Sequence, residues 1–166
     1  EDPEDFSDFW RMDRMTDAGL AVLVLGARAL CVDGFEDTAA RALLTRGLSL
    51  SGVRAYEALL GLKALRSMPE IAPRVALLGH SAGSIAGNLT FRIVPGFVAQ
   101  VTDLFGDHYA WTGEGFAASM APRLTPYRGL LADPATAPAP VLITPYGYEG
   151  TEEEVVAFLV AALAEP

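Results

Sequence analysis

Short apolar runs alternate along the chain with segments whose apolar residues recur at helical spacing. Four of the runs are of strand length, and they cover Leu20–Leu25, Val75–Leu78, Val98–Val101 and Val141–Ile143. Strand-length runs that alternate with helical segments are typical of a mostly parallel sheet covered by helices. The pattern therefore predicts an α/β fold, a three-layer α/β/α sandwich with these four strands in its sheet.

Two helices are predicted between the first two strands. One runs from Phe35 to Arg46 and ends at Gly47. The longer one begins at Ser51, a suitable N-cap, and reaches about Ser67. The apolar residues expected to face the sheet from this longer helix are Val53, Tyr56, Leu59, Leu60 and Leu62.

The length of the chain is sufficient for one domain with a real core, so we interpret residues 1–166 as a single domain. Residues 106–140 are its least regular part and are rich in proline. This stretch is predicted to be a long loop or small lid. Its aromatic residues Trp111, Phe116 and Tyr127 are suited to line a ligand pocket.

The charge of the chain limits its partners. A net charge of −9, with only 12 Lys and Arg residues, argues against nucleic acid or an anionic membrane. The longest apolar run, near residues 18–27, is too short to span a bilayer. The single Cys31 excludes an internal disulfide framework, and it is too far in sequence from His80 and His108 for a zinc site. Since no nucleotide-binding loop is present either, no metal or other cofactor is expected.

The candidate chemistry lies in Gly79-His80-Ser81-Ala82-Gly83, which matches the Gly-x-Ser-x-Gly nucleophile elbow. In such an elbow a strand ends in a sharp turn, and the serine takes a strained backbone conformation that exposes its hydroxyl above the sheet. Side chains two residues before and after the serine would collide, which accounts for Gly79 and Gly83. The N–H of Ala82 opens the next helix and is suited to stabilise an oxyanion.

The sequence around this pentapeptide strengthens a motif that is weak by itself. The strand Arg74–Leu78 precedes it, and a helix of small residues, Ala82–Gly87, follows it. This is the strand–turn–helix order that the motif requires. The alternative is a glycine-rich turn that carries an incidental serine.

On these residues the chain resembles the α/β-hydrolase superfamily, in particular its dienelactone-hydrolase-like and acetyl xylan esterase-like branches. The similarity spans about Ala18 to Leu163 and is carried by residues 18–24, 47–52, 74–83 and 137–143. Only the elbow among them is a sharp motif. The resemblance implies a serine hydrolase that acts on small carboxylic esters, including esters on carbohydrates.

The resemblance also implies a catalytic triad in the chain order serine, acid, histidine. Ser81 is its nucleophile, and the acid position, beyond the strand Val141–Ile143, falls near Glu149. A glutamate serves there because the acid orients and stabilises the imidazolium. The alternative for Glu149 is a solvated loop residue beside a helix N-terminus.

The histidine is where the chain departs from the family. The family's histidine follows a further strand, and this chain has none after Leu163. His108 is the candidate base, oriented by Asp103 or Asp107, and its alternative is a loop residue near the site. His80, in the variable elbow position, is expected to be a packed and hydrogen-bonded residue.

Both ends of the chain depart from the family pattern. No loop recognisable as the second oxyanion donor precedes the elbow, and the chain begins with Glu1 and shows no signal peptide. We therefore interpret it as a partial domain, processed or cut from a longer protein, with a secreted or periplasmic location allowed. Its open sheet edges favour self-association.

Two functions follow from these interpretations. The first is a serine hydrolase of small-molecule esters, with hydrolysis near background unless His108 supplies the base. The rival is a hydrolase-like domain without turnover that serves as a binding or assembly module.

Overall fold

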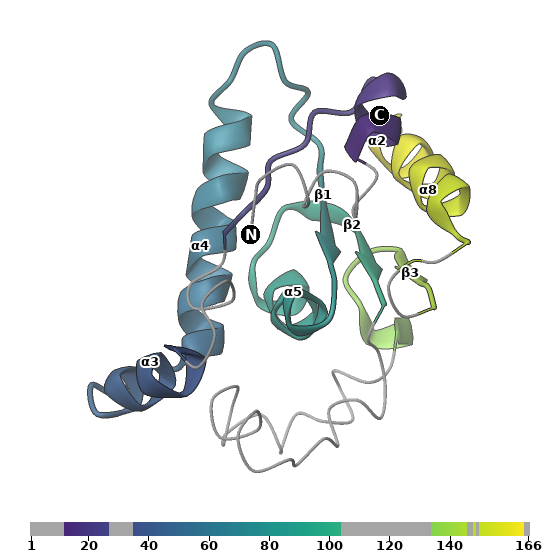
Figure 1. Cartoon of the computed structure of the whole chain (residues 1–166). Coiled ribbons are helices and arrows are strands. Elements are labelled where there is room, and N and C mark those ends of the chain that lie inside the picture. The colour runs from purple at the N-terminus through teal and green to yellow at the C-terminus, as the bar shows by residue number, and fades with distance from the viewer. Residues whose placement is uncertain (1–11, 27–34, 104–133, 146–147, 149, 165–166) are drawn as a thin grey trace.

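A computed structural model describes residues 12–26, 35–103, 134–145, 148 and 150–164. These residues form a mixed α/β fold around a small parallel sheet (Figure 1). The elements in chain order are α2 (Met12–Asp17), α3 (Phe35–Leu44), α4 (Leu50–Arg66), β1 (Val75–Gly79), α5 (Ala82–Ile93), β2 (Phe97–Thr102), the 3₁₀ turn η3 (Pro134–Thr136), β3 (Val141–Ile143) and α8 (Glu152–Ala164).

The sheet has three described strands in the order β1-β2-β3, and both pairs are parallel. Three of the predicted strands are thereby confirmed, with β2 in the centre. Because the strands are parallel, their carboxyl ends meet at one edge of the sheet, which is where ligands bind in such folds. Ser81 follows β1 and therefore lies at this edge.

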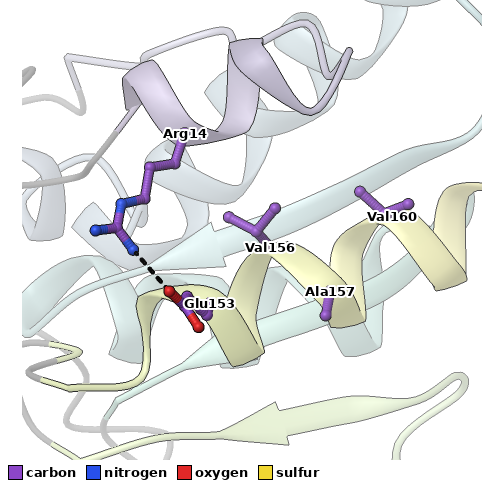
Figure 2. A pocket seen from close by; sticks show the side chains of 5 residues that line it. All are labelled: Arg14, Glu153, Val156, Ala157 and Val160. Carbon is purple, nitrogen blue, oxygen red and sulfur yellow. Dashed lines mark ion pairs between the residues drawn. The ribbon is translucent and has the colours of Figure 1, made fainter.

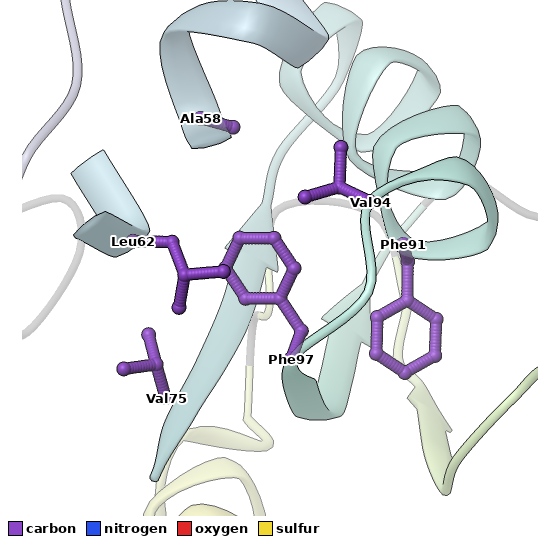
Figure 3. Close-up of a cluster of buried hydrophobic side chains, with 6 residues drawn as sticks. All are labelled: Ala58, Leu62, Val75, Phe91, Val94 and Phe97. Atoms are coloured by element: carbon purple, nitrogen blue, oxygen red, sulfur yellow. The ribbon is translucent and has the colours of Figure 1, made fainter. Parts of the chain in front are cut away.

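Apolar side chains are buried on both faces of the sheet. On one face, α4 and α5 pack against the strands through Ala58, Leu62, Val75, Phe91, Val94 and Phe97 (Figure 3). On the other face, α2 and α8 pack through Met15, Val101, Tyr148, Val155 and Leu159. Successive residues of β1 alternate between the two clusters: Leu77 packs on the first, and Ala76 and Leu78 pack on the second. Helices therefore cover the described sheet from both sides (Figure 1).

An irregularity in the pairing of β1 with β2 decides which side chains of β2 face α5. Val75 pairs with Phe97, whereas Leu77 pairs with Gln100, so β2 contains one extra residue in this stretch. Phe97 and Gln100 consequently face the same side of the sheet. Gln100 is fully buried there, and its amide donates to Oδ1 of Asn88 on α5 at 2.5 Å. This polar contact joins β2 to α5.

The prediction of a fourth strand at Leu20–Leu25 is wrong. The segment pairs with no strand among the described residues, and Val22 to Leu25 are each 39–49 % exposed. Its neighbour is helix α4, because a Cβ built on Gly61 would come within 3.1 Å of the Leu25 side chain. An apolar run becomes a strand only where another strand satisfies its backbone groups.

Helix α4 begins before the predicted position. Ser49 is the N-cap, and its hydroxyl accepts from the N–H of Gly52 at 3.0 Å, whereas Ser51 is buried in the first turn. The predicted inner face is wrong in part: Tyr56 and Leu60 are exposed, whereas Leu62 is buried and Leu59 packs against the core. A bulky apolar residue on the surface is common, so size alone does not identify a buried face. The inner face is formed mostly by small residues, among them Ala55, Ala58 and Gly61.

The other predicted segments have mixed outcomes. The helix expected from Phe35 is present as α3, and Gly47 after it has a φ of 74°. Most of the predicted loop or lid at 106–140 lies outside the described residues. Among the described helices, none has the length and apolar character needed to cross a bilayer.

Candidate active site

The turn between β1 and α5 has the backbone geometry that the elbow motif requires. β1 ends at Gly79, α5 begins at Ala82, and Ser81 between them has φ 48° and ψ −120°. Conformations of this kind cost about 1–3 kcal/mol in a residue other than glycine, and they persist only where the surrounding structure imposes them. The hydroxyl of Ser81 does not cap α5, although serine is a favoured N-cap.

Gly79 is the point of closest approach between β1 and α5. A Cβ on this residue would lie 2.6 Å from the carbonyl oxygen of Gly83 and 2.9 Å from the nitrogen of Ser84. Both are backbone atoms in the first turn of α5, so they cannot move aside independently of the helix. Glycine is therefore required at position 79, as predicted. The same steric reason does not hold for Gly83 within the described part of the structure, where a Cβ on it would meet nothing within 4 Å.

Asp103, the residue after β2, joins the turn to the neighbouring strand. Its carboxylate is inaccessible to solvent. Oδ1 accepts from the N–H of Ser81 at 3.0 Å and from the hydroxyl of Ser84 at 2.7 Å. Oδ2 accepts from Nδ1 of His80. A buried carboxylate needs several donors to offset its lost hydration, and these three groups provide them.

Ser84 binds the turn from the first turn of α5. The residue is fully buried, and its hydroxyl lies within hydrogen-bonding distance of both the Gly79 carbonyl and Oδ1 of Asp103. Its oxygen also accepts from the N–H of Asp103 at 3.2 Å. Ser84 therefore connects the last residue of β1 with the end of β2.

Tyr148 approaches the turn from the chain that follows β3. The residue is buried, and its hydroxyl donates to the carbonyl oxygen of Gly79. Burial, together with the nearby Asp103 carboxylate, raises the pKa of the Tyr148 phenol above its ordinary value. The phenol is therefore a neutral donor at physiological pH. We call Gly79, His80, Ser81, Ser84, Asp103 and Tyr148 the elbow cluster.

His80 is the one described histidine, and it is packed and hydrogen-bonded, as expected. Because a carboxylate only accepts, Nδ1 carries the hydrogen in the bond to Asp103. The ring centroid lies 6.2 Å from that of Tyr148, and the side chain is 18 % exposed. His80 thus has the same carboxylate partner as the backbone of Ser81.

The structure brings some predicted site residues together and leaves others outside its described part. Ser81, His80 and Asp103 meet at the carboxyl edge of the sheet. Ala82 is the first residue of α5, and the N–H groups in a first helical turn have no acceptor inside the helix. The candidate base His108 and the candidate acid Glu149 lie outside the described residues. So do the other loop residues named from the sequence, Asp107, Trp111, Phe116 and Tyr127.

Three roles in the elbow cluster do not follow from the sequence analysis. From the sequence, Asp103 or Asp107 is expected to orient His108, whereas among described residues the Asp103 carboxylate contacts His80, Ser81 and Ser84. The spacing of Ser81 and Ser84 is a usable signal, because residues three apart lie on neighbouring positions of a helix face. No local pattern indicates that Tyr148 reaches the carbonyl of a residue 69 positions earlier.

Other parts of the described structure offer no comparable chemistry. Its His, Cys, Asp and Glu residues form no group of three or more that could hold a metal ion. An open depression between α2 and α8 is lined by Arg14, Glu153, Val156, Ala157 and Val160 (Figure 2). Its ion pair joins Arg14 to Glu153 at 3.8 Å, and the glutamate side chain is almost fully exposed, so the pair contributes little.

Comparison with known proteins identifies no relative of the chain. No protein-family model, curated protein or solved structure matches the chain. The candidate site is consequently defined by the elbow cluster itself, at the carboxyl edge of a parallel sheet.

Proposed function

We propose that the chain is a serine hydrolase of small carboxylic esters, with the three-layer α/β/α sandwich of the α/β-hydrolase superfamily. The observation that supports this most is the backbone of Ser81, with φ 48° and ψ −120° between β1 and α5. Strained conformations in residues other than glycine are concentrated at functional sites. If Ser81 were incidental to a glycine-rich turn, we would expect glycine at this position, because glycine adopts the conformation without the penalty.

In the proposed reaction, Oγ of Ser81 attacks the carbonyl carbon of the ester and forms a tetrahedral intermediate. The N–H of Ala82, at the N-terminus of α5, stabilises the oxyanion. The C–O bond to the alcohol then breaks, and the proton from Ser81 passes through the base to the departing alkoxide. Water hydrolyses the acyl-enzyme and releases the carboxylic acid.

His108 is the proposed base and Glu149 the proposed acid of this reaction. His108 follows Asp103 by five residues, and Glu149 directly follows Tyr148. Both described neighbours contact the elbow, Asp103 through Ser81 and Tyr148 through Gly79. His80 is left out of the proposed triad because Asp103 holds it beside the turn.

The test is hydrolysis of p-nitrophenyl acetate by the whole chain and by variants Ser81→Ala and His108→Ala. Wild-type hydrolysis should exceed the rate with Ser81→Ala. General-base assistance is worth about 10²–10⁴ in rate, so His108→Ala should lose about that factor. Equal rates for wild type and Ser81→Ala would refute the esterase proposal. A full rate with His108→Ala would remove only His108 from the mechanism.

A second function, a binding or assembly module without turnover, is favoured by one observation. The described polar groups around Ser81 bind each other: Asp103 holds the turn, and Tyr148 caps the carbonyl of Gly79. Such contacts stabilise an elbow whether or not it reacts. This function predicts the background rate with all three proteins, and concentration-dependent self-association through the edges of the sheet in sedimentation.

A further inference from the structure

The carboxylate of Asp103 contacts Ser81, the residue with the strained backbone, and also its neighbours His80 and Ser84. It is inaccessible to solvent and lies at the end of the central strand β2. Among the described residues, its two oxygens accept from the N–H of Ser81, the hydroxyl of Ser84 and Nδ1 of His80. Two of these donors belong to the turn and one to α5.

The bond to the backbone of Ser81 is the important one. An N–H can reach a fixed acceptor in only a narrow range of φ, so the 3.0 Å contact restrains the peptide that enters Ser81. Hydrogen bonds to a charged acceptor are stronger than neutral ones, especially where water is excluded. The contact therefore helps to offset the strain at φ 48°.

The second contact, with Ser84, fixes the carboxylate itself. Oδ1 shares the Ser84 hydroxyl with the carbonyl of Gly79, and Ser84 in turn accepts from the N–H of Asp103. Oγ of Ser84 thus connects Gly79, the last residue of β1, with Asp103 at the end of β2. Moving Ser81 out of its conformation would break charge-assisted bonds in a buried site.

We propose that Asp103 is a positioning residue, which holds Ser81 in the strained conformation that presents its hydroxyl for attack. This inference rests on the proposed function, because it concerns the nucleophile of that reaction. Among the described residues, Asp103 acts through the backbone N–H of Ser81 and through His80, and not through the Ser81 hydroxyl. The expected consequence is a slower attack by Ser81 when the carboxylate is lost, without a change in the overall fold.

The test compares the whole chain with Asp103→Asn, Asp103→Ala and the control Gln100→Ala. Asparagine keeps an oxygen for the Ser81 N–H but lacks the charge, whereas alanine removes the acceptor. Gln100 forms another buried polar contact between β2 and α5, with Asn88, and it does not belong to the elbow cluster. Its variant therefore reports what a general loss of β2–α5 contacts does.

The first readout is the rate at which an alkyl fluorophosphonate modifies Ser81. In this reaction Oγ bonds to phosphorus, fluoride leaves, and the hydroxyl proton is lost to the base. Asp103→Ala should slow it by about 10- to 100-fold, the loss expected for a hydrogen bond to a charged group. Asp103→Asn should recover part of that rate, and Gln100→Ala should retain most of the wild-type rate. Wild-type reactivity in Asp103→Ala would overturn the proposal.

The second readout is the amide of Ser81 in NMR spectra of ¹⁵N-labelled protein, which needs no reactivity. Its proton should resonate downfield and exchange slowly in wild type, move upfield in Asp103→Asn, and exchange quickly in Asp103→Ala. An unchanged amide in Asp103→Asn would contradict the proposal even if the alanine variant does not fold. If Ser81 is never modified but its amide responds as expected, Asp103 still positions the turn and the esterase proposal is what fails.

Discussion

At the residue scale, the elbow cluster shows how buried polar groups are satisfied by one another. The carbonyl of Gly79 accepts from Tyr148 and shares the one hydroxyl hydrogen of Ser84 with the carboxylate of Asp103, which also accepts from Ser81 and His80. Each group left unpaired in such a place costs about 1–3 kcal/mol, so the cluster is sensitive to single substitutions.

The first prediction at this scale concerns the pH dependence of stability. The pKa of Tyr148 is raised by burial, so the unfolded chain ionises this phenol near pH 10 while the folded chain does not. The ionisation of Tyr148 should therefore leave the free energy of unfolding unchanged below about pH 10 and lower it as the pH rises further. Tyr148→Phe should lose about 1 kcal/mol at neutral pH and show a smaller decline at high pH.

Chemical denaturation between pH 8 and pH 11 measures this effect. The control is Tyr56→Phe, because Tyr56 is a mostly exposed tyrosine on α4. It should keep the wild-type decline. Parallel curves for wild type and Tyr148→Phe would show that the Tyr148 phenol is not held in its neutral form by the fold.

At the element scale, the turn depends on how closely β1 and α5 approach each other. Gly79 and Gly83 occupy equivalent places in the motif, but of the two only Gly79 lies against backbone atoms of the described structure. The motif alone suggests the same steric reason for both glycines, whereas the structure shows a close approach at Gly79. The sequence therefore identifies the turn correctly, whereas the distances between elements decide which of its residues are fixed.

The prediction at this scale uses the two glycines as a matched pair. Gly79→Ala should destabilise the protein by about 1–3 kcal/mol, because its Cβ would lie 2.6 Å from the carbonyl oxygen of Gly83. Gly83→Ala adds a methyl group within a helix, where no described atom lies within 4 Å of it, and should be neutral or stabilising by up to about 1 kcal/mol. Thermal or denaturant unfolding of both variants measures the difference, and equal stabilities would contradict the close approach.

Other elements show where sequence reasoning succeeds and fails. The strands β1, β2 and β3 follow from apolar runs bounded by turn residues, and all are present. The similar run Leu20–Leu25 is not a described strand, because strand formation depends on a neighbour that local sequence does not specify. The N-cap of α4 differs by two residues, since Ser49 and Ser51 are equally suitable until the backbone is known.

At the scale of the whole molecule, the fold gathers the elbow cluster from distant parts of the chain. β1, α5, the end of β2 and the chain after β3 each contribute a side chain or a backbone group. The parallel order makes this possible, because it brings the carboxyl ends of all three strands to one edge. The motif locates Ser81 from sequence, but its contacts with Asp103 and Tyr148 depend on strand order and register.

Covalent modification shows whether this fold presents Ser81 as a nucleophile, as we propose. The whole chain is incubated with an alkyl fluorophosphonate, digested, and mapped by mass spectrometry, with Ser81→Ala treated in parallel. A single attack is enough to leave an adduct, so the measurement does not depend on fast turnover. We predict an adduct on the peptide that contains Ser81, located at Ser81 and not at Ser84, and none in the variant. An unmodified Ser81 in folded protein would contradict the account.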